Sequence, residues 1–247
     1  MPNTPRTLPT LTALAGAVLA AGATAQTCEV RSGPKPPAVV ELYTSEGCSS
    51  CPPADRWLST LKPRDNVLAL SFHVNYWNHL GWRDPFATKE TTARQYQLKD
   101  ALGGKYVYTP QVVLNGRDHR DWNGQRASTL AGLPAAAAPA LRLSRQGNVV
   151  TAQIEATQGE TPSEFAGYWA MLQDGVVSKV TRGENAGEDL RHDHVVSLYQ
   201  PVPTWTAARG GRAQLTLPSG STQRVAFVVT KPGLTQPVQA LVLHCPA

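Results

Sequence analysis

Two patterns of apolar and polar residues follow one another along the chain, and each predicts a different architecture. In the first half, the runs at 37–44 and 67–74 are rich in apolar residues, and the second run is typical of a parallel strand covered on both faces. Each run is followed by a segment with helical spacing, at 48–61 and 88–102. The first half therefore predicts alternating strands and helices.

A hairpin and a short helix complete this half. Asn115-Gly116 is a strong two-residue turn signal between strands predicted at 110–114 and 117–122. Residues 125–133 have the pattern of a short helix. The predicted order is βαβαββα, an α/β domain with a mixed sheet flanked by helices.

The pattern changes after an Ala- and Pro-rich segment at 134–140, which predicts a linker. From Val150 to Ala156, apolar and polar residues alternate, as in a half-buried strand. Further strands are predicted at 167–172, 176–180, 194–198, 212–217, 224–230 and 238–244. Short strands at this spacing predict an antiparallel β-sandwich. We therefore expect two domains, at 26–133 and 141–247.

The first 25 residues have the features of a secretory signal peptide. An uncharged stretch rich in Ala and Leu at 11–22 precedes Ala23-Thr24-Ala25, and it is shorter than the roughly 20 residues of a membrane span. Gln26 and Thr27 precede Cys28, which argues against a lipid anchor. We expect a secreted or periplasmic protein, cleaved near Ala25, without a stable membrane anchor.

Charge adds little to this picture. The formal net charge is +5, and the sequence has no block of Lys and Arg. No nucleic-acid partner is expected.

The four cysteines fall into a close pair and a distant pair. In an oxidising compartment, Cys28 and Cys245 most simply form a structural disulfide that ties the two ends of the chain together. Free thiols at both ends are the alternative. The single CxxC motif argues against a zinc finger, and Pro52 stands where covalent haem attachment needs histidine. No organic cofactor is expected.

The close pair, Cys48 and Cys51, lies where a predicted strand turns into a predicted helix. The amides at the start of a helix have no intrahelical partner, so those of Ser49, Ser50 and Cys51 are predicted to stabilise a thiolate at Cys48. Such cysteines can have a pKa lowered from about 8.5 to roughly 3.5–7. We expect a redox-active disulfide in which Cys48 attacks and Cys51 resolves, with both serine hydroxyls as candidate donors to sulfur.

Two segments between residues 36 and 133 resemble the thioredoxin and glutaredoxin superfamily. Tyr43-Thr44 followed by Gly47-Cys48-x-x-Cys51 is similar to the active-site strand of glutaredoxins, and residues 108–116 resemble the segment that carries the cis-proline of the superfamily. The resemblance implies a thioredoxin-like fold and a cis bond at Thr109-Pro110, where an extended substrate would pair. An ordinary trans proline that opens a strand is the alternative.

A more specific resemblance covers both predicted domains. Residues 40–55, 73–77 and 182–187 resemble a bacterial family of secreted thioredoxin-like proteins known as domain of unknown function 1223. This resemblance implies no substrate. Residues 118–124 lack the Gly-Gly pair with which glutaredoxins help bind glutathione, so glutathione is not indicated as the reductant.

Four other side chains are candidates for the same site. Glu46 and Glu41 are candidate proton relays, with a solvated or salt-bridged carboxylate as the alternative for each. His73 and Asn75 fall at the carboxyl end of the second strand, the edge where open α/β sheets bind ligands. We expect them in a substrate groove or a proton relay.

Three functions remain open. The first is thiol-disulfide exchange with protein thiols, protein disulfides or a redox partner protein. The second is a copper chaperone that uses Cys48, Cys51 and His73, because two thiolates and an imidazole suit copper. The third is a non-catalytic binding module in which the CxxC disulfide is structural. His192 and His194 alternate on one predicted strand, which is typical of a surface hairpin.

Overall fold

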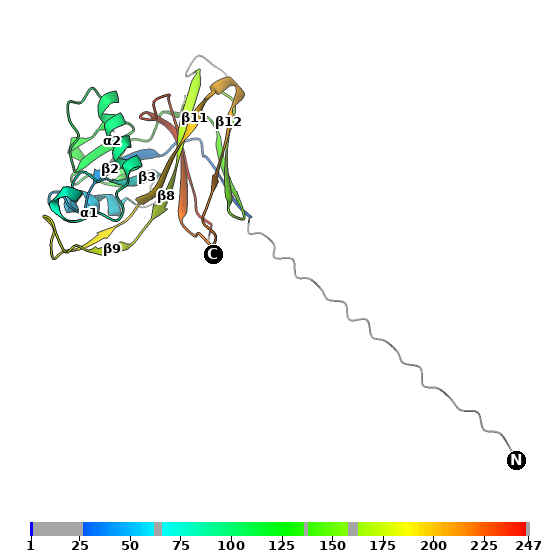
Figure 1. The fold of residues 1–247 in the computed structure, drawn as a ribbon. Coiled ribbons are helices and arrows are strands. Elements are labelled where there is room, and N and C mark those ends of the chain that lie inside the picture. Colours follow the sequence, from blue (N-terminus) through cyan, green and yellow to red (C-terminus); the bar gives the residue numbers. More distant parts are fainter. Residues whose placement is uncertain (2–26, 62–65, 136–137, 158–162, 246–247) are drawn as a thin grey trace.

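Strands from both halves of the sequence form one mixed sheet. The computed structural model describes residues 1, 27–61, 66–135, 138–157 and 163–245. Eight of its strands lie side by side, with β8 and β11 in the middle of the molecule (Figure 1). In spatial order they are β14 (Pro237–Leu243), β13 (Arg224–Thr230), β8 (Glu164–Gln173), β11 (Val195–Thr206), β3 (Val67–His73), β2 (Ala38–Thr44), β4 (Gln111–Leu114) and β5 (Arg117–Asp118).

A second, antiparallel sheet packs against one end of the large sheet. Its four strands, in order, are β1 (Thr27–Arg31), β6 (Leu141–Gln146), β7 (Val149–Ile154) and β12 (Gly211–Thr216). Leu143 from this sheet shares a buried core with Trp169 and Phe227 from the large sheet. A separate hairpin of β9 (Val176–Lys179) and β10 (Asp189–His192) contacts the first helix instead.

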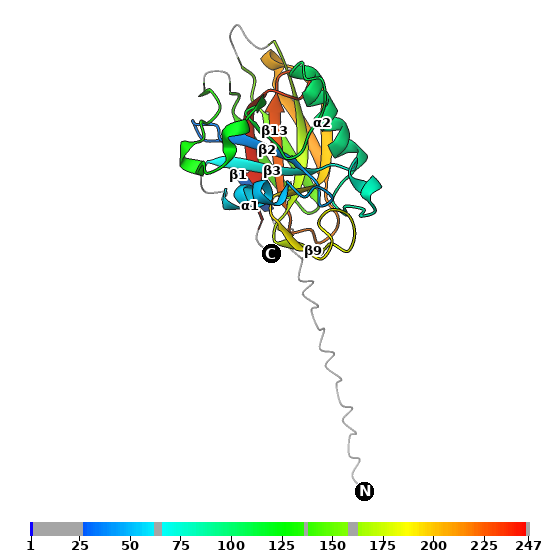
Figure 2. The ribbon, with the colours of Figure 1, turned by 90° about the vertical axis from the view of Figure 1, so that its left-hand side faces the viewer.

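Two α-helices lie at the other end of the large sheet, and Figure 2 views the molecule from this helical side. The first, α1 (Pro52–Thr60), packs on one face of β2 and β3, and α2 (Lys89–Ala101) packs on the other. Thr88 begins α2 with a capping box that it forms with Thr91. Short 3₁₀ turns are η2 (Asn78–Leu80), η3 (Arg120–Trp122), η4 (Ala127–Thr129) and η6 (Ala207–Arg209).

β11 joins the two halves of the large sheet. It pairs with β8 in antiparallel orientation and with β3 in parallel orientation, with Val195 opposite Ser71. The Ser71 amide donates a hydrogen bond of 2.8 Å to the carbonyl of His194. The edge of β3 is therefore occupied by a strand that lies more than 120 residues later in the sequence.

The predicted fold class is wrong. The large sheet does not end within residues 26–133, because β3 continues through β11 into β8, β13 and β14. β1, which was predicted to belong to the first domain, pairs with β6 in the second sheet. The sandwich predicted for 141–247 shares one of its layers with β2–β5. The division into folding units at 134–140 stays a prediction.

The closing helix predicted at 125–133 is also wrong, and the preceding strand is shorter than predicted. β5 has two residues, and the segment 125–133 contains only the 3₁₀ turn Ala127–Thr129. Gly124 precedes the segment, and Gly132 and Pro134 end it. The stretch between these residues is too short to hold an α-helix without a larger packed face.

A disulfide ties β1 to the segment after β14. Cys28 in β1 and Cys245 after β14 form a disulfide with a Cα–Cα distance of 6.0 Å. Among the described residues, no helix is both long and apolar enough to cross a bilayer. Residues 2–25 of the predicted signal peptide lie outside the described residues.

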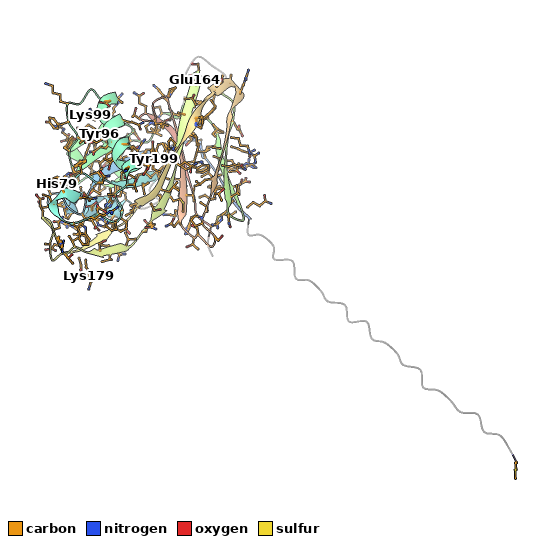
Figure 3. All side chains as sticks on the ribbon, in the orientation of Figure 1. His79, Tyr96, Lys99, Glu164, Lys179 and Tyr199 are labelled. Atoms are coloured by element: carbon orange, nitrogen blue, oxygen red, sulfur yellow. A yellow bond between two sulfur atoms is a disulfide. The ribbon has the colours of Figure 1, made fainter. Side chains whose placement is uncertain are left out.

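A buried ion pair connects β2, α2 and the later strands. Glu41 accepts from the Arg94 guanidinium, and both side chains are almost fully buried. Glu41 also accepts from Tyr43 at 2.7 Å and from Tyr168 at 3.1 Å, while Arg94 of α2 donates to Tyr199 of β11, which is labelled in Figure 3. Burial, and then the charge of Glu41, raises the pKa of Tyr43, so its hydroxyl remains a donor.

We expect Arg94→Ala to lower the free energy of unfolding by about 3–5 kcal/mol, because it leaves the Glu41 carboxylate buried without a cation. The control is Arg31→Ala, which breaks an exposed pair with Glu29 and should cost less than about 0.5 kcal/mol. Urea unfolding of both variants measures the difference. Equal stabilities would contradict the structural role of the ion pair.

Candidate functional site

The Cys48–Cys51 disulfide lies at the turn between β2 and α1. The two Cα atoms are 5.5 Å apart, and neither cysteine has any exposed surface. Two tight turns shape this loop, because the Cys48 amide donates to the Ser45 carbonyl at 3.1 Å and the Cys51 amide donates to the Cys48 carbonyl at 3.2 Å. The disulfide is thus held inside a compact loop.

The amides predicted to face the sulfur have other acceptors. The Cys51 amide donates to Cys48, the Ser49 amide donates to Glu184 at 3.0 Å, and α1 begins only at Pro52. Because Pro52 and Pro53 have no N–H group, the first turn offers no donor there. The predicted role of the Ser49 and Cys51 amides is therefore wrong. The Ser50 hydroxyl instead lies 3.4 Å from Cys48 Sγ.

The loop between β9 and β10 covers the disulfide loop. Glu184 accepts from both the amide and the hydroxyl of Ser49, at 3.0 and 2.8 Å. Asn185 is buried, and its Nδ2 donates to the carbonyls of Glu46 and Cys48 at 2.8 and 3.0 Å. The exposed contact of Glu184 and the buried contacts of Asn185 together hold the β9–β10 loop against the disulfide loop.

The proline turn lies at the same end of β2. The Thr109–Pro110 peptide bond is cis, and the next residue, Gln111, pairs with Tyr43 near the end of β2. The Trp77 indole donates to Thr109 Oγ1 at 2.8 Å. Trp77 also packs closely on Gly47: a Cβ atom added to Gly47 would lie only 2.9 Å from the Cβ atom of Trp77. Trp77 therefore connects the proline turn to the CxxC loop.

Glu41 and Asn75 have structural contacts. Both oxygens of Glu41 accept hydrogen bonds in the buried cluster with Arg94, which accounts for its burial without a proton-relay role. The backbone N–H of Asn75 donates to Thr92 Oγ1 of α2 at 3.0 Å. This bond helps to attach the loop after β3 to that helix.

Glu46 lies in a buried cluster beside the disulfide loop. It has no exposed surface, and its oxygens contact Trp82 Nε1 at 2.8 Å and His192 Nε2 at 3.2 Å. His192 lies in the β9–β10 hairpin as predicted, but His192 and His194 are both buried, so their expected place on the surface is wrong. Burial would lower the pKa of His192, but the carboxylates of Asp55 and Glu46 outweigh it and raise the pKa to about 9.

His73 belongs to the same cluster. Its Nδ1 lies 2.8 Å from Asp84 Oδ2, and its ring centroid is 4.8 Å from that of His192. Asp84 also accepts from the Glu46 amide at 2.9 Å. Burial would raise the pKa of Asp84, but His73 and the backbone hydrogen bonds outweigh it and lower the pKa.

Asp55 brings α1 into this cluster. Its Oδ2 accepts from Thr44 Oγ1 at 3.1 Å, and its Oδ1 lies 3.8 Å from His192 Nδ1. His73 thus has Asp55 and His192 as neighbouring donors, while the two cysteines are bonded to each other. The copper site of Cys48, Cys51 and His73, an alternative that the sequence left open, stays a prediction.

The comparisons with known proteins identify the family. Residues 39–230 match the family described as "Protein of unknown function (DUF1223)". The chain belongs to this family. No curated protein matches it.

Two solved structures are similar to this member of the family. A crystal structure of an Agrobacterium tumefaciens protein has 29% sequence identity and a TM-score of 0.63, and the match covers 84% of this chain and 93% of that one. HBP35 of Porphyromonas gingivalis has 14% sequence identity and a TM-score of 0.50, and the match covers 85% of this chain and 75% of that one. The second likeness concerns the fold alone.

The sequence did not predict a functional role for several residues that lie around the disulfide loop in the folded protein. Asp55, Glu184 and Asn185 lie in segments that carry the family resemblance, but no role was predicted for them; His192 was assigned to a surface hairpin, and Asp84 was not singled out. A local signal exists only for Asp55, which lies one helical turn after Cys51. The other four residues reach the site through tertiary contacts.

We expect Asn185→Ala to lower the free energy of unfolding by about 1–3 kcal/mol, because two buried carbonyl groups lose their donor. The control is Asn123→Ala, at an exposed position. Urea unfolding compares the two variants. If Asn185→Ala lowers the free energy of unfolding no more than the control does, Asn185 does not hold the β9–β10 loop against the disulfide loop.

Proposed function

We propose that the Cys48–Cys51 pair performs thiol-disulfide exchange with a partner dithiol or disulfide outside the cytoplasm. The observation that carries this proposal is a CxxC disulfide at a strand-to-helix turn, with the cis Thr109–Pro110 turn at the same end of β2. A CxxC pair in this setting is typical of redox sites.

The exchange proceeds in two steps. A partner thiolate attacks Cys48 Sγ, the Cys48–Cys51 bond breaks, and Cys51 leaves as a thiolate. A second partner thiolate then attacks the partner sulfur of the mixed disulfide and releases the Cys48 thiolate. The partner loses two electrons and gains a disulfide, while the protein pair gains the two electrons. The same steps in reverse reduce a partner disulfide.

The Ser50 hydroxyl supports this chemistry. It lies 3.4 Å from Cys48 Sγ, and a hydrogen bond to a sulfur is stronger when the sulfur carries a negative charge. The hydroxyl therefore stabilises the Cys48 thiolate relative to the disulfide. It takes the place that the sequence assigned to backbone amides.

Access to the sulfur requires the β9–β10 loop to move, because both cysteines are fully buried. The contact between Glu184 and Ser49 lies at the surface. Exposed contacts of this kind open at low cost compared with buried ones. A partner segment that accepts a hydrogen bond from the Ser49 amide can replace Glu184 and reach Cys48.

A structural disulfide is the second candidate. The complete burial of both cysteines favours it, since a structural disulfide needs no contact with a partner. Under this candidate the pair is reduced only when the protein unfolds.

We expect Glu184→Ala to speed the reduction of the Cys48–Cys51 disulfide by dithiothreitol about 3- to 10-fold under native conditions, because Ser49 loses its acceptor. Glu188→Ala, in the same loop, is the matched control and should leave the rate unchanged. Mass spectrometry of alkylated samples over time measures the rate. If the pair is reduced only at the rate of global unfolding in all three proteins, it is structural.

Variants of the two cysteines test which sulfur attacks. Reduced Cys51→Ser should accumulate a mixed disulfide with an oxidised peptide, because Cys48 remains and no resolving thiol follows. Cys48→Ser should form little of this adduct. Gel-shift analysis without reductant measures both, and equal adduct from the two variants would contradict the assignment of Cys48.

A further inference from the structure

Three buried polar atoms beside the disulfide loop converge without hydrogen-bond partners. They are Asp55 Oδ1 from α1, His73 Nε2 from β3 and His192 Nδ1 from β10. The three residues are 6%, 0% and 2% exposed, and their donor atoms lie within 4.8 Å of one another. Buried polar atoms nearly always have a partner, so three that face one another indicate a ligand.

The opposite atom of each side chain is already engaged. His73 Nδ1 lies 2.8 Å from Asp84, His192 Nε2 lies 3.2 Å from Glu46, and Asp55 Oδ2 accepts from Thr44 at 3.1 Å. A carboxylate behind each imidazole holds a proton on the far nitrogen, and a metal ion that binds the near nitrogen takes the place of any proton there. With such an ion bound, all three converging atoms would direct lone pairs to it.

Neither a water molecule nor a proton can provide a partner for all three atoms. A water molecule has two hydrogens and can donate to only two of the three atoms. A proton on His192 Nδ1 would point toward Asp55 Oδ1, but the two atoms are 3.8 Å apart, which is too far for a hydrogen bond. A cation can contact all three atoms at once.

The charge of the cluster also favours a cation. Glu46, Asp55 and Asp84 are buried, and among the ion pairs of the described residues none joins these carboxylates to Lys or Arg. Buried carboxylates need a positive charge nearby. Two histidines and one carboxylate form a donor set that suits divalent first-row transition metals, whereas Mg²⁺ and Ca²⁺ prefer oxygen ligands.

We propose that Asp55, His73 and His192 bind one divalent transition-metal ion of the zinc class. Bonds of about 2.0–2.1 Å place tetrahedral donors about 3.4 Å apart, so the donors need to move together by about 1 Å or less. Three protein ligands leave a fourth position for water or an exogenous group. The cysteines take no part, so the proposal is independent of thiol-disulfide exchange.

The site is coupled to the disulfide loop through the backbone. The Asp55 amide donates to the Cys51 carbonyl at 3.2 Å, and Asn185 bridges the carbonyls of Glu46 and Cys48. A bound ion holds α1, β3 and β10 together at one point. Metal occupancy should therefore brace the loop that carries the disulfide.

The test uses the purified protein with its disulfides intact, after removal of metal with a chelator. Titration with Zn²⁺ against a chromophoric chelator should give one ion per chain, and Co²⁺ should give visible absorption bands of a low-coordinate site. X-ray absorption of the zinc-loaded wild type should show nitrogen and oxygen neighbours with two imidazoles and no sulfur. No stoichiometric binding, or sulfur in the first shell, would overturn the proposal.

Variants then assign the ligands. His192→Ala and Asp55→Asn should each weaken Zn²⁺ binding at least about 100-fold, while the exposed control His79→Ala (Figure 3) and the Cys48→Ser/Cys51→Ser double variant should bind like the wild type. Unchanged affinity in folded His192→Ala, or lost affinity in the cysteine variant, would overturn the proposal. If His192→Ala does not fold, the absorption spectrum of the wild type decides alone.

Discussion

The parallel pairing of β3 with β11 is the contact on which the candidate site depends. It is short, with Val195 opposite Ser71 and a hydrogen bond from the Ser71 amide to the His194 carbonyl. His73 lies two residues after Ser71, and His192 lies three residues before Val195. The pairing therefore brings the two imidazoles together at the end of the sheet where the CxxC loop begins. It also turns what would be an exposed edge of β3 into the middle of a larger sheet.

Two buried clusters of charged side chains lie near β2, one around Glu41 and one around Glu46, and their carboxylates are neutralised in different ways. Glu41 has Arg94 as a partner, and two tyrosine hydroxyls complete its hydrogen bonds. That cluster is complete within the chain and ties the helical side to the later strands. The cluster around Glu46 has three carboxylates and only imidazoles as basic partners, and three of its atoms lack partners. This difference distinguishes a structural ion pair from a candidate binding site.

The reactivity of the CxxC pair depends on its cover as much as on its own loop. Two prolines remove donors from the first turn of α1, so the helix supplies no direct hydrogen bond from those positions to sulfur. The Ser50 hydroxyl lies beside Cys48 Sγ, and the β9–β10 loop is hydrogen-bonded to the Cys48 carbonyl, while both cysteines are buried. Partner access and the stability of the thiolate are therefore set by different segments, which point mutations can separate.

The sequence by itself determined the features that depend on neighbouring residues. The apolar runs located β2 and β3, the spacing located α1 and α2, and Thr109-Pro110 marked the turn that is cis. The close cysteine pair was visible for the same reason, because its two members are three residues apart. These features depend on residues within short segments of the chain, so hydrophobic periodicity and turn residues are enough to predict them.

Only the tertiary structure decided which strands pair and what surrounds the disulfide. An apolar run predicts that a strand is buried, but it does not show which strand pairs with its edge. The pairings of β11 with β3 and of β1 with β6 were therefore not predictable from the pattern. His192 reaches His73 across about 120 residues of sequence. Burial of the cysteines and convergence of three donor atoms are consequences of these long-range pairings, and no local pattern contains them.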